Sequence, residues 1–135
     1  MLVQLIDDTK NAVVAAVKGA GDIVTAVRGV VTTQLTGVAK DATNVTMALA
    51  DVVEGAIEGA VSVGADISTA AVSAVEGAIQ ASGNVGVSAT DAAEAALSGA
   101  VKAANKVGGD SLTVVKSALS SAAAIPADVV KKVLG

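Results

Sequence analysis

Apolar residues recur along the chain with a period of 11. Counted from Lys10, positions 3, 4, 6, 7, 10 and 11 of each 11-residue unit carry most of the alanine, valine, isoleucine and leucine residues. Eleven residues over three turns give about 3.67 residues per turn, which is close to an undistorted α-helix. On such a helix the six positions form one continuous arc of about half the circumference. The pattern therefore predicts amphipathic α-helices with a wide apolar face.

The charged residues test this register independently. The chain contains nine basic and thirteen acidic residues, and only Asp8 and Asp41 fall on the apolar arc. A false period would scatter the charges around the whole helix. The 11-residue register is therefore well supported, and any supercoil that it produces should be straight or right-handed.

Two 11-residue units combine into a repeat of 22 residues. The segment EGAI at 54–57 returns at 76–79 and, as SGAV, at 98–101. We treat residues 1–135 as a single repetitive domain with repeats at about 10–31, 32–53, 54–75, 76–97, 98–119 and 120–135. Gly55, Gly77 and Gly99 recur on the polar edge of the helix. There they would either let a neighbouring backbone approach or simply be tolerated.

Residues that favour helix N-caps recur at the same 22-residue spacing, and glycines precede several of them. Ser88 and Asp91 have the spacing of a capping box. The predicted caps are Asp22, Asn44, Asp66, Ser88 and Asp110.

These caps leave two architectures open. Helices of roughly 18–20 residues could break at each cap and fold back as hairpins, or one nearly continuous helix of about 200 Å could run through the chain. The apolar phase is preserved across every cap, which favours long helices with reversals at 82–84 and 108–109. Pro126 should end or restart the last helix. The expected fold is all-α, built from long amphipathic helices, and extended rather than globular.

The composition indicates that the apolar face needs a cover. The chain has no aromatic residue, so a core of alanine and valine must bring helix backbones close together. Fourteen glycines add a helix penalty on the order of 7 kcal/mol if half of them lie inside helices. We expect other copies of the chain, or a lipid-like surface, to cover an assembly face that comprises Ile23, Val27, Val45, Leu49, Ile57, Val61, Ile67, Ala71, Ile79, Leu97, Val101, Leu112 and Leu119.

The residues needed for common enzyme chemistry are scarce. The chain has no histidine and no cysteine, so a histidine base for a serine nucleophile and a thiolate metal site are missing. We predict no enzyme activity, no cofactor and no metal. Glu54 and Glu58, spaced i, i+4, could offer two carboxylates to a cation, but we interpret them as a solvated helix edge. Asp7 and Asp8 are interpreted as a helix cap and partner of the helix dipole.

The primary hypothesis is a structural protein that self-assembles through its apolar helix face into a homo-oligomeric bundle, tube or filament. The alternative follows from a resemblance. The 11-residue pattern and the EGAI segments resemble the repeats of synucleins, perilipins and exchangeable apolipoproteins. That resemblance, one of period over most of the chain, implies an amphipathic coat on a membrane, lipid droplet or polymer granule. Unlike those families, this chain has a net charge of −4 and no rows of interfacial lysine.

Charge and hydropathy also bear on partners and location. Basic residues are scattered and stacking aromatics are absent, so we predict no nucleic-acid partner. No uncharged stretch is long and apolar enough for a transmembrane helix. The segment 1–8 lacks the basic and apolar regions of a Sec signal peptide, which leaves a cytoplasmic location or signal-independent export open.

Overall fold

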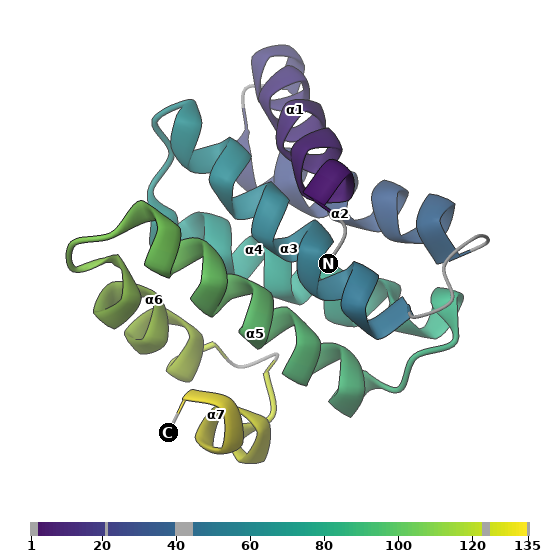
Figure 1. Ribbon diagram of the computed structural model, residues 1–135, viewed down its shortest axis with the longest axis vertical. Coiled ribbons are helices and arrows are strands. Elements are labelled where there is room, and N and C mark those ends of the chain that lie inside the picture. The colour runs from purple at the N-terminus through teal and green to yellow at the C-terminus, as the bar shows by residue number, and fades with distance from the viewer. Residues whose placement is uncertain (1–2, 21, 40–44, 123–124, 135) are drawn as a thin grey trace.

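Helices form wherever the 11-residue apolar arc runs without interruption. The computed structural model describes residues 3–20, 22–39, 45–122 and 125–134, and no strand occurs within these ranges. The helices follow one another along the chain (Figure 1) as α1 (Val3–Ala20), α2 (Ile23–Ala39), α3 (Val45–Ser62), α4 (Ile67–Ala81), the 3-10 helix η1 (Ser82–Val85), α5 (Ala89–Val107), α6 (Ser111–Ser120) and α7 (Ala127–Leu134). The all-α prediction is confirmed.

Of the two architectures that the sequence left open, the described residues show the one with separate helices, not the long helices that the apolar phase favoured. The α-helices are 8 to 19 residues long, and the chain turns between successive helices rather than only at 82–84 and 108–109. Gly64, Gly86 and Gly108 have positive φ angles of 89°, 76° and 82°, which end the preceding helical segment at little steric cost. The last helix, α7, begins directly after Pro126.

The helices lie side by side in two layers. In one layer α1, α3 and α5 are neighbours, and α7 packs beside α5 (Figure 1). The other layer contains α2, α4 and α6 in the same order. Each helix therefore contacts both the next helix in the chain and the one after it. This bundle-like packing does not show the predicted extended shape.

Recurrent glycines bring neighbouring helices of one layer into backbone contact. A Cβ atom at Gly55 would collide with the carbonyl oxygen of Ile6, and one at Gly99 with that of Ala50. At Gly77 the nearest atom would be the Cα atom of Arg28, at 3.3 Å. In all three contacts the partner lies 49 positions earlier in the sequence. The glycines thus permit close approach of helix backbones, one of the two alternatives left open by the sequence.

The core consists mainly of small side chains. Most buried positions hold alanine or valine, and the largest fully buried apolar side chains are Leu35, Leu49, Ile57, Leu97 and Leu119. Small side chains in the core are compatible with the close approach of helix backbones at the glycine contacts. Among the described residues, no helix is long and apolar enough to cross a membrane.

Candidate interaction surfaces

The predicted assembly face lies inside the folded chain. Six of its thirteen residues are buried and the other seven are partly buried, so none is freely exposed. Leu49, Ile57 and Leu97, for example, belong to the hydrophobic core shared by the two layers. The expectation that other copies or a lipid surface must cover this face therefore needs correction, because neighbouring helices of the same chain cover it.

The predicted caps stand at helix starts, with different hydrogen bonds. The side chain of Asp66 accepts a hydrogen bond from the backbone N–H of Thr69. The Ser88 hydroxyl oxygen accepts one from the N–H of Asp91 at 3.1 Å, which is one of the two bonds of a capping box. Asp110 is the N-cap of α6 but makes no side-chain cap bond. Asn44 lies outside the described residues.

Asp22 stands directly before α2. Its carboxylate accepts hydrogen bonds from the Thr25 hydroxyl at 2.8 Å and from the N–H of Val24 at 3.1 Å. These bonds, the Thr25 hydroxyl first, hold the pKa of Asp22 below its usual value, because they stabilise the ionised carboxylate.

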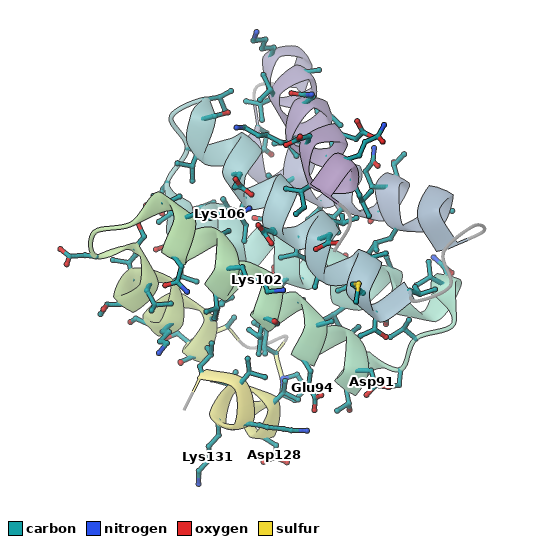
Figure 2. All side chains as sticks on the ribbon, in the orientation of Figure 1. Asp91, Glu94, Lys102, Lys106, Asp128 and Lys131 are labelled. Carbon is teal, nitrogen blue, oxygen red and sulfur yellow. The ribbon has the colours of Figure 1, made fainter. Side chains whose placement is uncertain are left out.

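Glu54 is not part of a solvated edge, contrary to expectation. Its side chain is fully buried between α3 and α5, where it forms an ion pair with Lys106. Glu58 lies 3.5 Å from the same ammonium group and is also largely covered. Lys106 itself is half-exposed (Figure 2), and its hydrogen bond to Glu54 raises the pKa of the lysine. A helix with neighbours in its own layer and in the second layer is covered over more than its apolar arc, which explains this burial.

Two further ion pairs join helices that are distant in sequence. Arg28 on α2 pairs with Glu76 on α4, beside the glycine contact at Gly77. Lys132 on α7 lies 2.8 Å from Glu94 on α5, and this bond raises the pKa of Lys132. The second pair links α7 to α5.

One side of the two-layer packing is open at α1. The positions of α1 that face away from α3, here called its back face, comprise Gln4, Asp7, Asp8, Asn11, Ala12, Ala15 and Ala16. Each is exposed or partly exposed, whereas its counterpart 44 residues later in α3 is buried. Asp8 corresponds to the buried Val52 of α3. The position of Asp8 is exposed, so a charge is tolerated there although it lies on the apolar arc. Asp7 and Asp8 are also not in the first turn of α1, so the interpretation as a helix cap is wrong.

The same side is open at α2. Its back face comprises Gly29, Val30, Thr33, Gln34 and Gly37, all exposed or partly exposed, and the corresponding residues of α4 are buried. The back faces of α1 and α2 border an open, uncharged groove, here called the N-terminal groove. Its lining consists of Ala12, Ala16, Thr25, Ala26, Gly29, Val30, Thr33 and Gln34.

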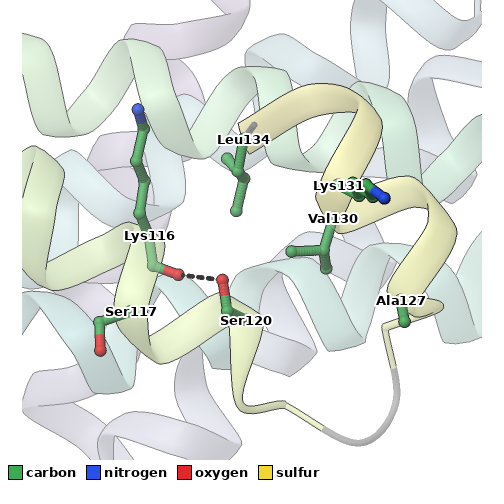
Figure 3. Close-up of a pocket in the computed structure, with 7 residues that line it drawn as sticks. All are labelled: Lys116, Ser117, Ser120, Ala127, Val130, Lys131 and Leu134. Atoms are coloured by element: carbon green, nitrogen blue, oxygen red, sulfur yellow. Dashed lines mark hydrogen bonds between the residues drawn. The ribbon is translucent and has the colours of Figure 1, made fainter.

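A second open groove lies at the opposite end, between α6 and α7 (Figure 3). This C-terminal groove is lined by Lys116, Ser117, Ser120, Ala127, Val130, Lys131 and Leu134. The Ser120 hydroxyl donates a hydrogen bond to the carbonyl oxygen of Lys116 at 2.7 Å, so it is occupied within α6. The two lysines make the groove basic, while Val130 and Leu134 supply its apolar part.

The sequence pattern did not predict these grooves. The one available signal was Asp8, a charge on the apolar arc, which marks a helix face without a covering neighbour. Within the described residues, no group of three or more carboxylates, histidines or cysteines could hold a metal ion. Comparisons with protein-family models, with curated proteins and with solved structures found no match to this chain.

Proposed function

We propose that this protein is a non-enzymatic structural protein that assembles with copies of itself. In this proposal the helices α1 to α6 and the additional helix α7 of each copy form one segment of a longer stack of helices. The proposal treats the chain as one repetitive domain. It differs from the sequence hypothesis in the surface used, because the apolar helix face is occupied by the chain's own helices. We assign assembly to the two ends of the stack, where α1, α2, α6 and α7 border open grooves.

One observation carries the proposal: the same contact is repeated in one direction. Gly55, Gly77 and Gly99 each receive the helix that lies two earlier in the chain. A contact between two different faces leaves one face unfilled at each end of a stack, unless the rotation closes the stack into a ring. In repeat proteins with a stable end, the terminal repeat carries a polar outer face. Here polar residues occupy part of the α1 back face, but the α2 back face is uncharged and the C-terminal groove is partly apolar, so neither end has a polar outer face throughout.

The lipid-coat alternative loses its main support in this packing. A coat helix would place its apolar face on lipid, but that face forms the core. In addition, only Met47, Val107 and Val114 are large apolar side chains that the described part of the chain exposes. Three separate side chains on different helices do not make a continuous lipid-binding face.

Circular dichroism and sedimentation velocity of lipid-free protein test the proposal together. We expect a helical spectrum without lipid and a sedimentation coefficient that rises with protein concentration. Negative-stain images at the highest concentration should show elongated particles. A helical protein that stays monomeric at every concentration would contradict assembly. A chain that is disordered until vesicles are added would favour the lipid coat instead.

A further inference from the structure

We propose, building on the assembly above, that copies join head to tail. In this arrangement α1 of one copy enters the C-terminal groove of the copy before it. At the same time, α7 of the earlier copy enters the N-terminal groove of the later one. The partner of both grooves is therefore a second copy of this chain.

The order of helices within the chain indicates this arrangement. Each helix contacts the two helices before it, as α3 contacts α1 and α2. A helix placed after α7 would accordingly lie on α6 and α7, which border the C-terminal groove. A helix placed before α1 would lie on α1 and α2, which border the N-terminal groove. Joining two copies end to end fills both grooves in one step.

The register of the contacts predicts which residues meet. Asn11 stands in α1 where Gly55 stands in α3, since the two positions are 44 residues apart. Lys116 in α6 is the counterpart of Arg28 in α2 and of Ala50 in α3, because the three positions differ by multiples of 22 residues. Continuing the intrachain contact across two copies therefore places Asn11 opposite Lys116. A side chain at the glycine position keeps these two helices further apart than those within the chain.

Charge complements this register. Asp7 and Asp8 are exposed on the back face of α1, one turn before Asn11. Lys116 and Lys131 line the groove that α1 would enter. The aspartates and lysines would then lie within reach of each other, and opposed charges at an interface favour one partner and one register.

The intrachain ion pair is not copied residue for residue. Lys10 occupies the position that Glu76 occupies in α4, so in this register it faces Lys116 with the same charge instead of forming an equivalent of the Arg28–Glu76 pair. The attraction must come from Asp7 and Asp8. An interface held by exposed ion pairs should weaken as the salt concentration rises.

A reciprocal charge reversal tests the interface. The first variant is Asp7→Lys with Asp8→Lys, the second is Lys116→Glu with Lys131→Glu, and the third combines all four changes. Sedimentation equilibrium measures the association constant of each, and circular dichroism checks that each is folded.

The first variant should lower the association constant at least tenfold, because lysines then face lysines. The second should lower it less, because Lys116→Glu removes the repulsion between Lys116 and Lys10 while it repels Asp7 and Asp8. The combined variant should restore the association constant, as should an equimolar mixture of the first two. If the wild-type chain associates and neither reversal matters, the interface is elsewhere while the proposed assembly stands. If the wild-type chain never associates, both proposals fall, and Gln4, Asp7, Asp8 and Asn11 close the stack as a polar end.

A second measurement needs no variant. A carbodiimide joins a carboxylate directly to an amine in contact with it, so treated wild-type oligomers should yield peptides that link Asp7 or Asp8 to Lys116 or Lys131. Such links should disappear at high salt together with the oligomers. Oligomers that contain only other intermolecular links would overturn the proposed interface.

Discussion

One added methyl group at Gly99 should open the contact between α5 and α3. A Cβ atom there would approach the carbonyl oxygen of Ala50 more closely than the 3.0 Å that real Cβ atoms keep. That oxygen belongs to the backbone of α3 and cannot rotate away as a side chain could. The substitution Gly99→Ala therefore forces the two helices apart.

The cost follows from the geometry of this contact. Relief of the overlap requires a separation of about 1 Å, which forfeits about a quarter to a half of the dispersion energy between the facing atoms. Overpacking of this kind typically costs about 1–3 kcal/mol. Alanine recovers up to about 1 kcal/mol through its higher helix propensity. The net loss should be about 1–2 kcal/mol, which lowers the Tm by roughly 3–8 °C in a chain of this size.

Urea denaturation followed by far-ultraviolet circular dichroism measures this loss, at protein concentrations low enough to avoid association. The signal must come from the backbone because the chain has no aromatic residue. Gly29→Ala in α2 is the matched control, since a Cβ there would meet no atom within 4 Å. The control should be stabilised by about 0.5–1 kcal/mol. A Gly99→Ala protein at least as stable as wild type would refute the reasoning.

Three further predictions concern the ion pair and the caps. Lys106→Met should cost about 2–3 kcal/mol in urea unfolding because Glu54 is then buried without its cation, and Glu54→Leu with Lys106→Met should recover most of it. The pKa of Lys106 is raised on folding, so its contribution to stability is complete below the ordinary value of 10.5 and is lost as pH rises through the folded value. Alkaline titration of the unfolding free energy should show this loss in wild type and not in Lys106→Met. Asp66→Ala and Ser88→Ala should each cost about 1 kcal/mol, whereas Asp110→Ala should cost much less, as thermal unfolding can show.

The helical regions could be predicted from the sequence, but the apolar pattern alone could not predict where one helix ends and the next begins. Apolar phase is preserved across Asp66 and Ser88, which favoured continuity. The same phase arises when separate helices repeat at 22 residues, because two 11-residue units make six turns and return to the same side. Only the turn chemistry distinguishes the two cases, and it correctly indicates a break wherever a positive-φ glycine precedes a cap.

Burial on the polar arc could not be predicted from the pattern. Helix periodicity assigns one covered face, but α3 has neighbours on both sides in its layer and in the second layer. Glu54 is therefore enclosed although it lies on the polar arc, and its charge is retained through Lys106. Asp8 is the converse case, an exposed charge on the apolar arc at the open end of the packing.

Disulfide cross-linking between engineered cysteines tests most directly whether the intrachain contact continues between copies. The natural chain has no cysteine, so Asn11→Cys in one sample and Lys116→Cys in another provide one thiol each. On mixing and mild oxidation, the head-to-tail register predicts a rapid Asn11→Cys to Lys116→Cys disulfide, because such bonds need Cα atoms about 4.4–6.8 Å apart. Thr113→Cys, exposed on the same helix α6 but outside the groove, should react much more slowly. Equal rates at the two positions, or no cross-link to Lys116→Cys, would contradict the account.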